Sequence, residues 1–247
     1  MSRKLENARN LYLHGIRDGN AREAVTKYTG ERYTQHSAGV KDGIEGFVEF
    51  FEPFLARNPV RDIQVIRSIE HGQYVFVHVF QSLNHGESRW VTMDMFDTDK
   101  NDRIIEHWDV IAEYVDDTAS GHSMISGPTE IVDLEATLNN KNVVTEFLVE
   151  VLGKGNLETI TNYVSTDTYI QHSPKVADGI AGTVAFLRAQ AESGSPLRYD
   201  EVFKVIGQGN LVAGLSKASI GEKSMAVFDA FSPFLKFVGD GNAGSST

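Results

Sequence analysis

The sequence predicts an α+β protein built from two tandem copies of one unit, in which three helices precede a curved antiparallel sheet of about four strands. The first observation is a repeat: YTQHSAGVKDGIEG at Tyr33–Gly46 returns as YIQHSPKVADGIAG at Tyr169–Gly182, with nine of the 14 positions identical and no gap. Chance would give about one match at average residue frequencies. The second is a change from helical to alternating apolar spacing within each half. The third is the length of 247 residues, which suits two domains of about 120 residues each.

Three helices are expected in the first half. Apolar residues at helical spacing predict a helix over 4–16 and a short second helix over 21–28. The third helix starts after Asp42, a good N-cap residue, and Glu45 three residues later completes a possible capping box. Pro53 is expected to end or bend this helix, because proline lacks the backbone N–H that a helix interior needs.

Alternating residues then predict strands. The segments that alternate are 63–69, 74–83, 89–97 and 103–112, rich in β-branched and aromatic residues and separated by turn sequences. The repeated YTQHS segment itself is a possible further short strand.

The second half follows the same order. Asp178 precedes its third helix, and the strands are expected at 199–206, 210–220 and 223–229. Phe228-Asp229 matches Phe96-Asp97, after which the two halves diverge. The predicted organisation is a first domain at 1–115, a polar linker at 116–136, a second domain with a degenerate last strand at 137–238 and a flexible tail at 239–247.

Composition restricts the classes of partner. The formal net charge is -11, from 34 acidic and 23 basic residues, and no basic cluster stands out. We therefore expect neither a nucleic-acid surface nor attachment to an anionic membrane. The chain has no cysteine, which excludes disulfides and thiolate chemistry and fits a cytoplasmic location.

Three features together resemble a known family. They are the order of helices before the sheet, the Y-x-Q-H…D-G-x-x-G segment, and the I-x-E-H-W-D-V ending at Ile104–Val110. This combination is similar to the SnoaL-like polyketide cyclases of the nuclear transport factor 2-like superfamily, well over residues 5–112 and more weakly over 140–230. The resemblance implies a cone-shaped α+β barrel, in which a bent sheet surrounds a pocket that the helices close. The same fold also serves isomerases, dehydratases, hydrolases and non-catalytic modules.

Strand alternation suggests where chemistry takes place. His107 and Asp109 share one face of their strand, about 7 Å apart. Asp94 shares a face with Trp90, and His78 shares a face with Phe76. If these faces line the cone, they form one aromatic pocket containing His78, Asp94, His107 and Asp109. Burial there raises carboxylate pKa values and a nearby imidazolium lowers them, a combination suited to proton transfer.

The resemblance assigns roles to these residues. SnoaL-like cyclases use an acidic residue for intramolecular aldol closure without a metal or cofactor, which nominates Asp109, supported by His107. Gln35 and His36 would lie at the pocket mouth as donors to a substrate oxygen. The expected substrate-binding residues are Tyr33, Gln35, His36, Phe76, Trp90 and Trp108.

Each candidate also has a structural explanation. His36 and its repeat His172 would tie the loop to the next helix, and His78 would be a satisfied core histidine. His107 and Asp109 would form a buried pair that holds the last strand. A metal site would need His36, His78, His107 and Asp109, which lack a local ligand spacing, so no metal is expected.

Two classes of function remain open. The first is a cofactor-independent enzyme for aldol-type cyclisation, isomerisation or dehydration of a small carbonyl compound, with an epoxide-hydrolase-like use of Asp94 and Asp109 as a variant. The second is a non-catalytic small-ligand-binding or interaction protein, favoured by the loss of the EHWD segment in the second half. Because such cones pair through their sheets, the resemblance also implies a pseudo-dimer within the chain or a homodimer.

Overall fold

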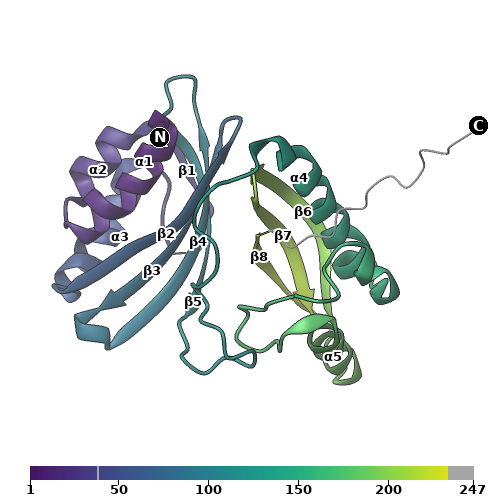
Figure 1. Cartoon of the computed structure of the whole chain (residues 1–247). Coiled ribbons are helices and arrows are strands. Elements are labelled where there is room, and N and C mark those ends of the chain that lie inside the picture. The colour runs from purple at the N-terminus through teal and green to yellow at the C-terminus, as the bar shows by residue number, and fades with distance from the viewer. Residues whose placement is uncertain (38, 233–247) are drawn as a thin grey trace, which may run out of the picture.

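The computed structural model describes residues 1–37 and 39–232. It is a mixed α+β structure with two curved sheets that lie back to back in the middle of the molecule, while the helices lie on the outer flanks (Figure 1). The predicted α+β class and the order of helices before strands are confirmed for both halves.

The first half contains every element that the sequence predicts. Its elements are α1 (Arg3–Asn10), a π-helix (Leu11–Arg17), α2 (Ala21–Tyr28), β1 (Thr29–Gln35), α3 (Gly43–Arg57), β2 (Arg61–His71), β3 (Tyr74–Leu83), a 3-10 turn (Asn84–Gly86), β4 (Ser88–Thr98) and β5 (Ile104–Glu113). The sheet has the order β1-β5-β4-β3-β2. The YTQHS segment contributes to β1, which runs parallel to β5, whereas the other pairs are antiparallel.

The second half also has helices before strands, and its sheet has fewer strands within the described residues. Its elements are a 3-10 turn (Leu134–Ala136), α4 (Thr137–Glu146), a π-helix (Phe147–Gly153), a 3-10 helix (Leu157–Asn162), α5 (Gly179–Glu192), β6 (Leu197–Gln208), β7 (Leu211–Ile220) and β8 (Lys223–Phe231). The sheet order is β6-β7-β8. Within the described residues no strand pairs with β8 on its far side, so this half has no counterpart of β5 or β1.

The repeated motif forms the same loop in both halves. The Asp42 carboxylate accepts a hydrogen bond from the Gln35 backbone N–H at 2.7 Å, and Asp178 accepts from the Gln171 N–H at 2.8 Å. Gly46 follows, where an added Cβ would lie 2.1 Å from the carbonyl oxygen of Lys41. The aspartate and the glycine of the motif therefore close the loop that enters α3 and α5.

The structure differs from the predicted capping box of α3 and from a helix end at Pro53. Asp42 lies at the N-cap position, but no capping box forms, because its side chain binds the Gln35 N–H and Glu45 pairs instead with Arg22 at 2.7 Å. The helix also continues through Pro53 to Arg57. Apolar side chains on both sides of the proline, Phe51, Phe54 and Leu55, pack against the core.

A hydrophobic cluster joins the two sheets. Phe76 and Met95 from the first sheet pack with Ile206, Leu215 and other side chains from the second. The ring centroids of Phe76 and Phe228 are 6.0 Å apart. The outer face of the first sheet is therefore buried against the second sheet.

The segment predicted as a linker is attached to both halves. The Val132 N–H donates to the Asn210 side chain at 2.8 Å, and Arg67 donates to the carbonyl oxygens of Ile125 and Ser126. The predicted tail at 239–247 lies outside the described residues. None of the helices in the described ranges has the length and apolar character that a membrane crossing requires.

The packing between the sheets leads to a prediction about stability. Phe76→Ala should lower the free energy of unfolding by about 3–5 kcal/mol, because it removes a fully buried ring and leaves a cavity. Urea denaturation followed by circular dichroism measures the loss. Phe50→Ala, at a ring that is 40% exposed, is the matched control and should cost about 1 kcal/mol or less. Equal losses for the two variants would contradict the described packing.

Candidate functional site

Asp94 lies at the centre of a buried polar cluster in the first half. It is on β4, directly opposite Val77 of β3 and Asp109 of β5, and its side chain has no exposed surface. Val77 belongs to the core beneath the helices, so Asp94 points toward the helices and away from the second sheet. A carboxylate in this position needs hydrogen-bond donors.

Two side chains meet this requirement. The Tyr12 hydroxyl, on the π-helix, lies 2.8 and 2.9 Å from the two carboxylate oxygens of Asp94. His107 Nε2 lies 2.7 Å from Asp94 Oδ1, and its Nδ1 lies 2.7 Å from the amide oxygen of Gln35. Nδ1 is therefore a donor to Gln35. Nε2 either donates to ionised Asp94 or accepts from protonated Asp94, so the pair holds one shared proton.

Burial dominates the electrostatics of this cluster. It raises the pKa of Asp94, while the hydrogen bond from His107 acts in the opposite direction. Burial and the charge of Asp94 raise the pKa of Tyr12 well above its ordinary value, so the phenol stays protonated and donates. The Asp94–His107 pair is thus a protonatable unit with little contact with water.

Asp109 differs from the arrangement that the sequence predicts. It shares the face of His107 as expected, yet His107 bonds to Asp94, and Asp109 accepts a hydrogen bond from the Ser37 hydroxyl. Asp109 is half-buried, whereas Asp94 is fully buried. Directly opposed residues of an antiparallel pair have Cβ atoms about 5 Å apart, so the two carboxylates are neighbours.

His78 does not join the cluster, and its predicted place beside Asp94 is wrong. It pairs with Met93 rather than with Asp94, so it lies on the opposite face of the sheet. Its side chain is fully buried and its Nδ1 lies 3.2 Å from Arg67. Burial, followed by the Arg67 charge, lowers its pKa to about 3. Phe76 shares this outer face and packs between the two sheets instead of lining the cone.

The other predicted binding residues separate into two groups. Tyr33 and Trp90 pack in or against the core of the first half, on the side of Asp94. His36 and Trp108 stack on each other with ring centroids 4.8 Å apart, and Trp108 belongs to the cluster between the sheets. His36 also contacts Glu106 at 2.8 Å, so it ties the loop to β5 and not to the next helix.

Asp229 is a residue that the sequence analysis missed. Val77 pairs with Asp94, and Gly214, which has the corresponding place in β7, pairs with Asp229. Asp229 is therefore the counterpart of Asp94, although sequence identity matches it to Asp97. The turn of the second hairpin, Gly221-Glu222, is shorter than Asn84–Glu87, and this difference was the signal that could have corrected the match.

The surroundings of Asp229 lack a histidine. The Tyr199 hydroxyl donates to its two oxygens at 3.2 and 3.1 Å. Burial raises the pKa of Asp229 to about 6, and the Tyr199 hydrogen bond acts in the opposite direction. Tyr169 and Gln171, the repeats of Tyr33 and Gln35, lie in the same region.

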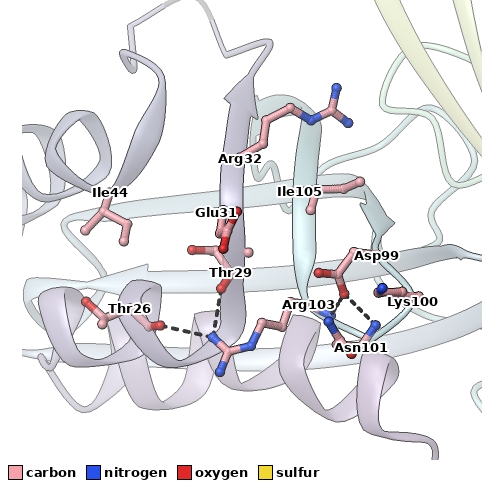
Figure 2. Close-up of a pocket in the computed structure, with 11 residues that line it drawn as sticks. Thr26, Thr29, Glu31, Arg32, Ile44, Asp99, Lys100, Asn101, Arg103 and Ile105 are labelled. Atoms are coloured by element: carbon pink, nitrogen blue, oxygen red, sulfur yellow. Dashed lines mark hydrogen bonds between the residues drawn. The ribbon is translucent and has the colours of Figure 1, made fainter.

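A separate pocket of about 640 Å³ lies at the outer end of β1 and β5 (Figure 2). Figure 2 shows that Arg103 in this pocket is held by the carbonyl oxygens of Thr26 and Thr29, and that Asp99 accepts from backbone N–H groups of its own turn. None of the predicted site residues lines it. Over the described residues, no group of three or more His, Asp or Glu side chains has an arrangement that could hold a metal ion.

Comparison with known proteins gives structural similarity only. No family model matches the sequence, and no curated protein matches it. A candidate polyketide cyclase from Bacillus cereus ATCC 10987 aligns with 44% of this chain and 73% of its own, at 16% identity and a TM-score of 0.39. A candidate polyketide cyclase from Acidithiobacillus ferrooxidans aligns with 45% of this chain and 89% of its own, at 20% identity and a TM-score of 0.39. A candidate SnoaL-like polyketide cyclase from Jannaschia sp. CCS1 aligns with 44% of this chain and 84% of its own, at 18% identity and a TM-score of 0.37. Each alignment covers less than half of this chain, so none extends over two tandem copies.

The environment of Asp229 predicts a pH-dependent stability. Its pKa of about 6, against an ordinary 3.8, means that the folded protein binds a proton more tightly than the unfolded chain. The contribution of Asp229 to the free energy of unfolding therefore falls as the pH rises from about 4 to 6, by about 3 kcal/mol. Urea denaturation at pH 4 and pH 7 measures the free energy of unfolding at each pH. In Asp229→Asn the decrease in this free energy from pH 4 to pH 7 should be absent.

Asp200→Asn, at an exposed carboxylate of β6, controls for the loss of one negative charge. A pH dependence in Asp229→Asn that equals that of the unaltered protein would show that Asp229 does not titrate in this range.

Proposed function

We propose that the first half is a cofactor-independent acid/base enzyme that acts on a small carbonyl compound by aldol-type cyclisation, isomerisation or dehydration. The observation that carries the proposal is the buried Asp94–His107 pair beside the half-buried Asp109. Titratable groups that differ in burial and lie on one face of a sheet are suited to taking and returning a proton.

The three titratable groups have different roles in this proposal. Asp94 has no exposed surface and therefore cannot touch a substrate, so it acts as a positioning residue. Asp109 is the carboxylate that a substrate can reach, and it is the proposed base. It takes a proton from the carbon next to the substrate carbonyl, the C–H electron pair forms an enolate, and the proton later returns from Asp109 to the product.

Gln35 is the proposed donor to the enolate oxygen. Its amide oxygen is held by His107 Nδ1 at 2.7 Å, which leaves the amide hydrogens to donate. His107 is in turn held by Asp94 at 2.7 Å. The chain Asp94–His107–Gln35 therefore orients a neutral donor toward the position where negative charge develops, which is the general requirement for stabilising an oxyanion.

A second candidate is an activity that adds or removes water, as in a dehydratase or an epoxide hydrolase. The observation in its favour is the direct opposition of Asp94 and Asp109 across β4 and β5. In this candidate Asp109 contacts the water molecule, and the neighbouring buried Asp94 influences the proton affinity of Asp109. Formation of a diol from styrene oxide, lost in Asp94→Asn, would favour this candidate over the first.

We also propose that the chain is a duplicated unit that forms its sheet-to-sheet pair internally. The π-helices Leu11–Arg17 and Phe147–Gly153 occupy corresponding positions, and the loop bond of Asp42 is repeated by Asp178. The outer faces of both sheets are used in this pairing. No second copy of the chain is then needed to cover them.

The enzyme proposal predicts proton exchange at a substrate carbon. Incubation with 2-oxobutanoate or acetoin in D₂O should give deuterium incorporation next to the carbonyl, measured by proton NMR. Asp109→Asn should slow incorporation by about 10²–10⁴-fold, because it removes the proposed base. His107→Ala should also slow it, since Gln35 loses its orientation.

Asp62→Asn, at an exposed carboxylate of β2, is the matched control and should leave the exchange rate unchanged. If Asp109→Asn and His107→Ala exchanged as fast as the unaltered protein, the assignment of these residues would be wrong.

The internal pairing predicts the size of the particle in solution. Light scattering should give a mass close to the chain mass of 27.3 kDa. A stable particle of twice this mass would show that the internal pair is not the whole assembly.

A further inference from the structure

A cavity of about 670 Å³ lies in the second half, apart from the Asp94 cluster. Its walls include α5 and the loop that carries the second copy of the motif. The outer face of β4 and β5 closes it from the other side, through Met93 and Val110. Its volume is within the range of about 300–1,000 Å³ that is usual for small-molecule sites.

Residues on both faces of β8 line the cavity. Val227 and Asp229 line it from the inner face of this strand, and Phe228 and Ala230 line it from the outer face. In the first half the corresponding edge is covered by β5, which pairs with β4. Within the part of the chain that the structure describes, β8 has no such partner.

Most of the lining is apolar, and the polar groups gather in two places. One is Asp229 with Tyr169 and Tyr199, and the other is Arg67 with His172. Arg67 is already engaged, because its guanidinium donates to two backbone carbonyls and contacts His78. Its positive charge and the negative charge of Asp229 both belong to the lining, and this balance favours a neutral occupant.

Asp229 is the group to which a ligand could donate a hydrogen bond. Its side chain is half-buried, and among the described residues the Tyr199 hydroxyl is the one hydrogen-bond donor to it. Two carboxylate oxygens can accept about four hydrogen bonds. A carboxylate that faces an apolar cavity therefore has acceptor capacity for a further donor.

We propose that this cavity binds a neutral, largely apolar small molecule whose hydroxyl group donates a hydrogen bond to Asp229. No histidine lies beside Asp229 as His107 lies beside Asp94, so the site holds its ligand without the proton transfer proposed for the first half. This is a second site, and it does not depend on the activity of the first.

The test uses two fluorescent probes of the same shape. The full chain is titrated at pH 7.5 with 2-naphthol, which can donate a hydrogen bond, and with 2-methoxynaphthalene, which cannot. We expect 2-naphthol to bind saturably at one site. Asp229→Asn should weaken 2-naphthol about tenfold and change 2-methoxynaphthalene little, because hydrogen bonds to charged acceptors are about twice as strong as neutral ones.

A second variant tests the location without changing a charge. Leu187→Trp, on the α5 wall, fills part of the cavity and should weaken both probes. Circular dichroism and the melting temperature establish that each variant is folded. Asp200→Asn, on the exposed side of β6, is the matched control for Asp229→Asn and should bind both probes as the unaltered chain does.

The pH dependence gives an independent readout. Binding of 2-naphthol should weaken as the pH falls through about 6, since protonated Asp229 is a poorer acceptor. Tyr199 and Tyr169 are the other titratable groups beside it, and burial raises both of their pKa values, that of Tyr169 to about 12. The change between pH 5 and pH 8 should therefore disappear in Asp229→Asn. Absence of 2-naphthol binding, or binding of 2-naphthol by Asp229→Asn and Leu187→Trp as tight as that by the unaltered chain, would overturn the proposal.

Discussion

The burial of Asp94 is the constraint on which the first half depends. A carboxylate without exposed surface destabilises the fold unless donors reach it, because the free energy of an unpaired buried charge exceeds typical folding stability. Tyr12 from the N-terminal helix and His107 from β5 reach it, and Gln35 from the repeated motif holds His107. One side chain thus couples the helix layer, the sheet and the motif loop, and the same contacts that stabilise the fold orient the proposed catalytic groups.

Apolar spacing located nearly every helix and strand, but it could not assign the faces of β3. Alternation normally distinguishes a buried face from a solvated one, and here both faces are buried. Val77 packs beneath the helices, whereas Phe76 packs against the second sheet. His78 and Asp94 therefore both looked like pocket residues, although they point to opposite sides. The second sheet is a tertiary feature that no local pattern in β3 encodes.

The sequence did not reveal that Asp229 corresponds in space to Asp94, and the reason is a different one. Identical dipeptides aligned it with Asp97, while the strand register aligns it with Asp94. The turn before β8, Gly221-Glu222, is two residues shorter than Asn84–Glu87, whereas the match of the dipeptides would need a larger difference in length. Pairing in a sheet is set by backbone hydrogen bonds across the strands, so residues that correspond in space need not be those that correspond in sequence. By contrast, the Asp42 and Asp178 loop bonds involve no change of length, and there the repeat predicted the structure correctly.

The corresponding aspartates of the two halves, Asp94 and Asp229, have different hydrogen-bond partners. Asp94 has a histidine that shares its proton and a second carboxylate across the strand, so a proton can be passed within the cluster. Asp229 has a phenol, whose raised pKa prevents it from taking part in proton transfer near neutral pH. Within the described residues no strand pairs with β8 as β5 pairs with β4, and residues of β8 line a cavity. The contacts of Asp229 therefore favour the proposed ligand binding over acid/base chemistry in the second half.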